Sequence, residues 1–222
     1  MFRAWLNSIA AALLFAGTAW GTPYWVEYNA ANGNFPEAEG WTRYTLGGGA
    51  MRYFEDGALV LDDQGAPLDD MYGWSQPGAL DPASGQIFVA QWRLCTSQLD
   101  GLWDSTVAVF SDQRRGAAFD FGWDSVHVPG AGTVATFEPA TFHDFEFRSV
   151  DMLTYDLYVD SVHAYSGSFW SSVTGSLVGW GDSTQGVASV TRWEFCRFGV
   201  VPEPHVALLV VWLVAWGVPR HR

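Results

Sequence analysis

The sequence predicts an all-β fold, an antiparallel β-sandwich, for the central part of the chain. Short stretches rich in β-branched and aromatic residues recur there, separated by clusters of Gly, Pro, Asp and Ser, as in sandwiches and barrels. No amphipathic helical pattern interrupts them. Hydrophobic residues make up 49% and charged residues 16% of the 222 residues, which favours a packed core. We expect one domain over residues 22–200.

Nine stretches are expected to form strands, and the alternation of side chains is clearest in 143–149, where His143, Phe145 and Phe147 share one face. A turn near Asp151 and a second turn at Asp160 and Ser161 would bring the next two strands beside it. The nine stretches, in order, are 58–61, 86–96, 105–111, 117–123, 133–137, 143–149, 154–159, 162–166 and 192–198.

The hairpin of 142–160 resembles that of concanavalin A-like sandwiches, which include laminarinase-type glycoside hydrolases and laminin-G-like modules. In those families Phe-His-x-Tyr leads into a strand that ends in Tyr-Val-Asp-Gly. Here Phe142 and His143 begin the pattern, and Ser161 replaces the final glycine. Residues 195–200 resemble the closing strand of such a sandwich. The resemblance implies a concanavalin A-like jelly roll.

The first residues read as a secretory signal peptide, 1–19. Arg3 supplies the positive start, 4–16 form a short apolar core, and small residues precede the expected cut after Ala19, with Gly21 as the second choice. We therefore expect the protein to be exported.

The last residues, 201–222, contain Pro202, Glu203 and Pro204, an apolar run at 206–218 and a basic end. At about 1.5 Å per residue the run spans roughly 20 Å, which is short for a permanent membrane helix. This order resembles the PEP-CTERM sorting signal. The resemblance implies an exosortase as processing partner and only transient anchoring in the membrane. The alternative is an ordinary C-terminal anchor held near the interface by Trp212 and Trp216.

The chain is acidic, with a formal charge of −13. Without both ends, 8 Arg face 23 acidic residues, a balance of −15. Such a surface repels phosphate, so nucleic acid and anionic lipid headgroups are not expected as ligands, whereas calcium or neutral sugars remain open. The chain has no lysine, which excludes Schiff-base chemistry.

An enzyme is not expected. Glycoside hydrolysis needs two carboxylates across a sugar, and the Glu-x-Asp-x-x-Glu strand of laminarinase-like enzymes is absent. Asp120 and Asp124 are four residues apart and are expected on one strand face, so hydrolysis is kept as a low-probability alternative.

The two cysteines, Cys95 and Cys196, suit a disulfide in an exported protein, with two buried free thiols as the alternative. Calcium is a further possibility, because oxygen ligands cluster in an expected loop at Asp62, Asp63, Asp69 and Asp70. A solvated acidic loop is the other interpretation.

Aromatic residues beside Gly, Ser or Asp in expected loops are candidates for sugar contact, because flat rings suit the C–H faces of sugars. The candidates are Trp74, Trp123 with Asp124, Trp170, and Trp180 with Asp182. We therefore expect a non-catalytic module that binds an extracellular polysaccharide or matrix. The alternatives are a structural envelope or matrix component without specific glycan binding and, third, a glycoside hydrolase.

Overall fold

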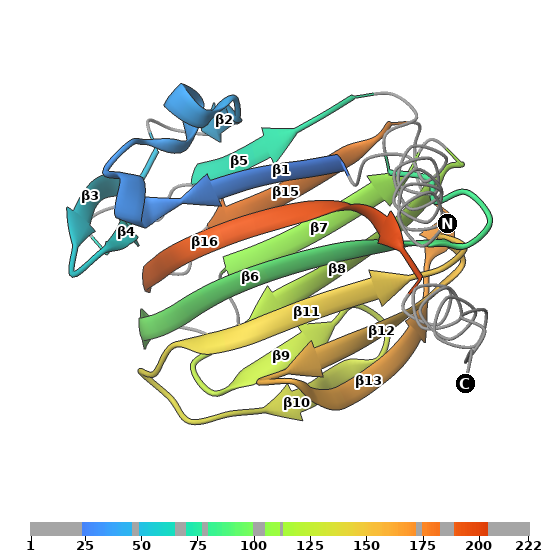
Figure 1. Cartoon of the computed structure of the whole chain (residues 1–222). Coiled ribbons are helices and arrows are strands. Elements are labelled where there is room, and N and C mark those ends of the chain that lie inside the picture. Colours follow the sequence, from blue (N-terminus) through green and yellow to red (C-terminus); the bar gives the residue numbers. More distant parts are fainter. Residues whose placement is uncertain are drawn as a thin grey trace, which may run out of the picture.

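The computed structural model describes residues 24–45, 49–64, 70–76, 80–99, 105–111, 113–171, 175–182 and 189–203. Two antiparallel sheets pack across a hydrophobic core, which confirms the predicted β-sandwich (Figure 1). The predicted signal peptide and apolar tail lie outside the described residues. Within the described part of the chain, no helix has the length and apolar character needed to span a bilayer.

The first sheet, sheet A, has the strand order β13-β12-β11-β6-β16-β4-β3, and β1 pairs with β16. Its centre is the long pair β6 and β16, flanked by the predicted hairpin. Its strands are β1 (Tyr24–Asn29), β3 (Met51–Glu55), β4 (Ala58–Asp62), β6 (Gln86–Leu99), β11 (His143–Ser149), β12 (Thr154–Val159), β13 (Val162–Ser168) and β16 (Ser189–Pro202).

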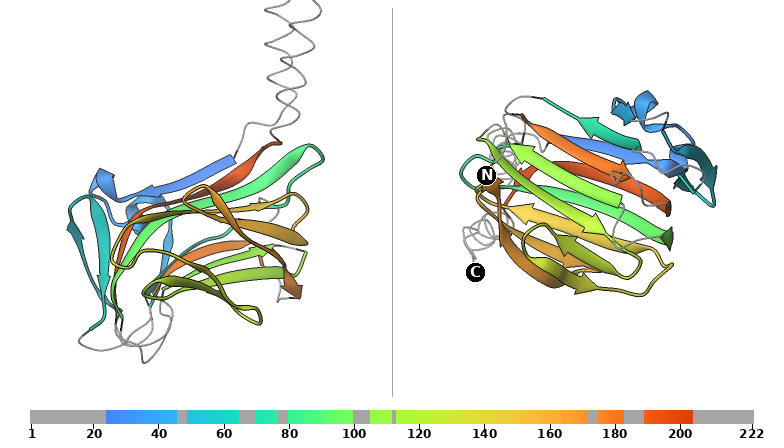
Figure 2. Two further views of the ribbon diagram at one scale, coloured as in Figure 1. Left: turned by 90° about the horizontal axis from the view of Figure 1, so that it is seen from below. Right: turned by 180° about the vertical axis from the view of Figure 1, so that it is seen from behind.

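The second sheet, sheet B, has the order β10-β9-β8-β7-β15-β5-β2, and β14 pairs with β8. Figure 2 shows the two sheets edge-on as two layers. Its strands are β2 (Thr42–Thr45), β5 (Asp70–Trp74), β7 (Ser105–Ser111), β8 (Arg115–Phe121), β9 (Ser125–Val128), β10 (Gly132–Thr136), β14 (Trp170–Ser171) and β15 (Leu177–Asp182).

The alternation expected in β11 is confirmed. Phe145 and Phe147 are buried between the sheets, and Phe145 stacks on Trp92 of β6 with ring centroids 6.0 Å apart. Asp144 and Arg148 point away from the core and are exposed. Because the side-chain period of a strand is two, this register places every aromatic ring of β11 inside.

One side of the sandwich is closed by chain that folds over it. The β3–β4 end of sheet A curls toward sheet B (Figure 2, left), and two short 3-10 helices, η1 (Ala30–Asn32) and η2 (Pro36–Glu39), follow β1. Arg52 of β3 donates to the Tyr72 hydroxyl of β5 at 3.1 Å, which links the curled end to the other sheet. Trp180 is fully buried behind this covering.

The other side ends in the hairpins β11–β12–β13. Asp151 orders the first turn, because its Oδ1 accepts hydrogen bonds from the backbone of Leu153 and Thr154 at 2.8 and 3.0 Å. Partial burial opposes its ionisation, but the backbone hydrogen bonds outweigh burial and lower the pKa of Asp151. Asp160 and Ser161 form the second turn with φ of 48° and 67°, the left-handed conformation that a glycine would adopt more easily.

His143 ties this second turn to the sheet. Its Nδ1 lies 2.6 Å from Asp160 Oδ2 and its Nε2 lies 2.9 Å from the carbonyl oxygen of Glu138. Partial burial disfavours the charged form of Asp160, but the hydrogen bond from His143 and the backbone N–H of Asp144 outweigh it and lower the pKa. His143 is thus a satisfied structural group.

Candidate functional site

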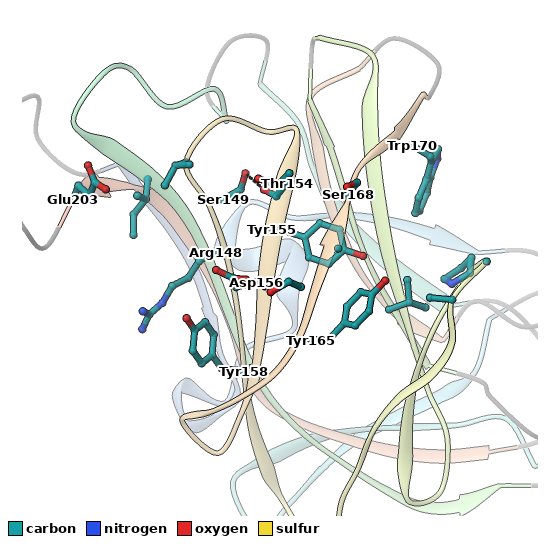
Figure 3. Close-up of a pocket in the computed structure, with 18 residues that line it drawn as sticks. Arg148, Ser149, Thr154, Tyr155, Asp156, Tyr158, Tyr165, Ser168, Trp170 and Glu203 are labelled. Carbon is teal, nitrogen blue, oxygen red and sulfur yellow. Dashed lines mark hydrogen bonds between the residues drawn. The ribbon is translucent and has the colours of Figure 1, made fainter.

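A depression of about 950 Å³ lies at the hairpin side of the sandwich. It is formed by β12 and β13, the end of β11, the turn between β9 and β10, and Trp170 of β14. In Figure 3 the hairpin divides it, with Tyr155 and Tyr165 pointing to one side and Arg148 and Tyr158 lying on the other. The volume is that of pockets that hold small organic ligands.

The inner half is aromatic. Tyr155 packs against Phe119 and Phe147 of the core, with ring centroids 5.4 and 5.1 Å away, and its ring is 6.2 Å from that of Tyr165. Trp170 is 36% exposed and lines the same half. Tyr155 itself is only 4% exposed and forms the floor of this half, whereas the half-buried Tyr165 and the exposed Trp170 are open enough to stack on a sugar.

Gly167 leaves the space that Tyr155 occupies. A Cβ at Gly167 would lie 2.5 Å from the Tyr155 hydroxyl and 2.7 Å from the Tyr165 ring. Burial, together with the nearby Tyr165, raises the pKa of Tyr155 to about 12, so the phenol stays neutral and able to donate a hydrogen bond.

The outer half is polar. Ser166 donates to Asp156 Oδ1 at 2.6 Å, and His163 Nε2 lies 3.0 Å from the Ser166 hydroxyl and 3.4 Å from Asp156 Oδ1. Serine and aspartate thus meet the same ring nitrogen, whereas a nucleophilic triad needs them on opposite nitrogens. The cluster offers hydroxyl and carboxylate groups for hydrogen bonding, but its geometry is not that of an acyl-transfer centre.

Two of the predicted aromatic and acidic contacts, Trp180 and Asp182, are wrong in position, whereas the role of Trp74 stays a prediction. Trp180 and Asp182 are completely buried in β15, and Trp74 of β5 is half-buried with its ring 5.0 Å from that of Phe198. The glycines around Trp180 suggested a loop, but they lie on the outer face of a central strand. At Gly181 a Cβ would approach the Asp70 carbonyl oxygen to 2.5 Å, so only glycine fits there.

Trp123 and Asp124 do lie in an exposed turn, between β8 and β9. This turn is at the opposite end of β9 from residues 129–131, which line the depression, so the depression does not include it. Their role as ligand contacts stays a prediction.

The pair of carboxylates considered for hydrolysis is not on one strand face. Asp120 is the penultimate residue of β8 and accepts a hydrogen bond from Thr106 at 2.9 Å, and its Oδ2 lies 3.4 Å from His127. Strand β8 stops at Phe121, so Asp124 belongs to the following turn. The expected arrangement is therefore wrong.

The acidic residues proposed for calcium mostly bind protein groups. Asp70 is buried and takes two hydrogen bonds from Arg43, each 2.6 Å long. Asp63 accepts from the backbone N–H of Ser189, and Asp62 accepts from that of Gln64 at 3.1 Å. Asp69 lies outside the described residues. Within the described ranges, no three His, Cys, Asp or Glu side chains gather closely enough to hold a metal ion.

The predicted disulfide is wrong, since both cysteines are buried free thiols. They lie on neighbouring strands, but Cys95 is opposite Arg192 and Cys196 is opposite Trp92. An offset of three residues corresponds to roughly 10 Å along a strand, whereas a disulfide needs Cα atoms about 4.4–6.8 Å apart. Cys196 also belongs to the core, which raises its thiol pKa by burial.

Two residues of the predicted sorting motif are described. Pro202 ends β16 opposite Gln86, and the backbone N–H of Glu203 donates to the carbonyl oxygen of Gly85 at 2.9 Å. Glu203 also lines the depression (Figure 3). Pro204 lies outside the described residues.

No family model and no curated protein matches the sequence. Solved structures match the fold. A sialidase matches with a TM-score of 0.55 and 15% identity over 85% of this chain, which spans only 19% of the sialidase. The carbohydrate esterase vb_24B_21 of Shiga toxin-encoding bacteriophage phi24B matches with a TM-score of 0.60 and 13% identity. The match covers 82% of this chain and 100% of the esterase. A Bacillus subtilis protein of unknown function with a galectin-like fold matches with a TM-score of 0.53 and 8% identity. The match covers 83% of this chain and 99% of that protein. The chain therefore has a lectin-like β-sandwich fold.

The sequence predicted the strands that build the depression but not the depression itself. Tyr155, Tyr158 and Tyr165 were assigned to strands, and only Trp170 was a candidate contact. An available signal was the density of Tyr and Ser in 154–170 on an edge hairpin, where side chains of both faces can reach solvent.

Proposed function

We propose that the sandwich is a non-catalytic carbohydrate-binding module and that its glycan lies in the depression beside β12 and β13. The observation that carries the proposal is the pairing of two accessible aromatic rings, Tyr165 and Trp170, with hydroxyl and carboxylate groups on the same edge. Sugars present C–H faces and hydroxyls on one molecule, so they use both kinds of group.

The test compares two exposed tryptophans. Trp170 and Trp123 are 36% and 41% exposed, but only Trp170 lines the depression. A polysaccharide array would be probed with the purified chain and with Trp170→Ala and Trp123→Ala, each with and without calcium. We expect Trp170→Ala to weaken glycan binding about fivefold or more, since a stacked ring contributes about 1 kcal/mol or more, and Trp123→Ala to leave it unchanged.

The reverse result would place the ligand at the β8–β9 turn. A calcium requirement would point to the acidic loop near Asp62. Absence of any bound glycan would refute the proposal and leave a structural envelope component as the function. Release of reducing sugar ends from a bound polysaccharide would contradict the non-catalytic part and favour a glycoside hydrolase.

We further propose that the protein is exported through a signal peptide at 1–19 and that an exosortase processes it at a PEP-CTERM signal in 201–222. The motif supports this, and Pro202 lies at the end of the last strand, so that the predicted signal directly follows the folded domain. Intact-mass measurement of the protein recovered from the cell envelope tests it. A mass lacking both ends is expected, and a mass that retains the tail would favour a permanent anchor.

A further inference from the structure

Beyond the depression, the outer face of sheet A carries a second hollow of about 540 Å³. It lies over the central strands β16, β6, β11 and β12. The lining groups used below are Gln91, Glu146, Arg148, Tyr158, Phe195 and Arg197. Arg148 lines both this hollow and the depression, so the two are adjacent.

A chain of hydrogen bonds fixes two arginines in this hollow. Arg197 donates through Nε to Gln91 Oε1 at 2.8 Å, and the Gln91 amide donates to Glu146. Arg148 donates through Nε to the other oxygen of Glu146. The hydrogen bond from Nε thus fixes the position of each guanidinium group.

Aromatic rings support both guanidinium groups. The Cζ atom of Arg148 lies 4.6 Å from the centre of the Tyr158 ring. Arg197 lies 5.0 Å from the centre of Phe195 and 5.9 Å from that of Trp25, which is 44% exposed. Stacking on a ring limits the orientations of the planar group, so less entropy is lost when a ligand binds.

Four other arginines of the sandwich differ in how they are paired. Their terminal nitrogens, Nη1 or Nη2, contact carboxylates in the pairs Arg43–Asp70, Arg52–Glu37, Arg93–Asp144 and Arg192–Glu55. In the described part of the chain, Arg148 and Arg197 contact protein acceptors through Nε alone. Their terminal N–H groups form the fork that matches a carboxylate and make no hydrogen bond with an acidic side chain of the described residues. The two carboxylates that line the hollow already have partners, since Asp144 pairs with Arg93 and Glu146 accepts from Arg148 Nε and Gln91.

We propose that this hollow binds the carboxylate of an acidic sugar, a uronic acid unit of the glycan held in the neighbouring depression. The proposal rests on the carbohydrate-binding function and specifies its ligand class. The exposed Trp25, which lies beside Arg197, offers a ring for the sugar, and Arg148 and Arg197 offer the forks. The net charge of −13 repels polyanions at long range. At physiological salt, screening confines this repulsion to about 8 Å. Closer than that, the charges of the two arginines determine whether an acidic sugar binds in the hollow.

The test uses two ligands that differ only in the carboxylate, a galacturonic acid oligosaccharide and its methyl ester. Calorimetry at physiological salt would measure the Kd of both for the full chain and for Arg197→Gln, Arg148→Gln and Arg114→Gln. Arg114 lies in the exposed β7–β8 turn, so its substitution removes the same charge away from the hollow. Thermal melts of each variant confirm that it is folded.

The expected result is at least about tenfold tighter binding of the acid than of the ester. Arg197→Gln and Arg148→Gln each remove most of that preference, and Arg114→Gln keeps it. Equal binding of acid and ester, or a preference that survives both substitutions, overturns the acidic subsite and leaves the carbohydrate-binding function standing. Binding of neutral glycans alone on the array does the same. If no glycan of any kind binds, the proposed function fails and the subsite fails with it.

Discussion

Two aromatic regions of this sandwich have similar composition but different covering. On the closed side, Trp180 stacks between Tyr28 and Tyr72, with centroids 5.1 and 4.9 Å away, and β3, β4 and the 3-10 helices cover them. On the hairpin side, Tyr155 is also buried, at 4% exposed, but it lines the depression, and Tyr165 and Trp170 beside it are accessible to solvent. The comparison teaches that a cluster of rings becomes core or site according to what packs over it.

The largest expected effect is on the closed side. Trp180→Ala should lower the free energy of unfolding by about 3–5 kcal/mol, because it removes a fully buried ring that touches four other aromatic rings. Chemical denaturation measures the change. A loss below about 1 kcal/mol would show that the closed side is not packed as described.

Gly167→Ala should destabilise by about 1–3 kcal/mol, since its new methyl group would overlap the rings of Tyr155 and Tyr165. It should also weaken glycan binding by displacing those rings. Gly179→Ala is the matched control, because its nearest neighbours would be 3.6 and 3.7 Å away. If both variants behave alike in denaturation, the inner half of the depression is looser than the structure indicates.

The alkaline stability of the two regions should depend on buried tyrosines. Burial raises the pKa of Tyr155 and of Tyr72 to about 12, and it also raises the pKa of Tyr28. The unfolded chain therefore releases these protons first, and the free energy of unfolding falls as the pH rises from about 10 to about 12.

Because the chain has no lysine, this titration belongs mainly to the tyrosines and to the two buried thiols, Cys95 and Cys196, whose pKa burial also raises. Denaturation at several alkaline pH values, with Tyr155→Phe beside the parent chain, measures the contribution of the open edge. The variant should lose less stability over that range. An identical pH dependence would mean that Tyr155 ionises as readily in the folded as in the unfolded chain.

The smallest effect on stability is expected at the rim. Trp170→Ala should change the free energy of unfolding by about 1 kcal/mol or less, because the side chain is 36% exposed. The same variant should show the loss of glycan binding described above. A loss of stability as large as that of Trp180→Ala would assign Trp170 to the core instead.

The pattern of residues in the strands was enough to predict the sandwich and its hairpin. Alternation in 143–149 predicted which side chains of β11 are buried, and the turn residues near Asp151 and at Asp160 predicted the pairing with β12. Both are local properties, set by the period of the strand and by turn chemistry. The first strand, β1, was not predicted, because the first expected stretch begins at residue 58. The last strand is longer than the expected 192–198, since β16 spans Ser189–Pro202.

The site could not be predicted in the same way. Gly179, Trp180 and Gly181 read as a loop in sequence, but they form a central strand because β5 and β7 flank β15 on both sides. The cysteines suited a disulfide by number, but the register of β6 against β16 keeps them apart. Both outcomes depend on pairing with strands that are distant in the sequence. Cys95, for example, lies opposite Arg192, more than 70 residues away.

The sequence by itself determined the class of fold, the acidic charge and the motifs at both ends, because strand period, composition and short motifs are local or additive properties. Only the tertiary structure decided which aromatic rings are buried under β3 and β4 and which stand open beside β13. It also decided that Arg148 and Arg197 line one hollow. Burial and convergence depend on which strands become neighbours, and that choice is made by packing of the whole chain.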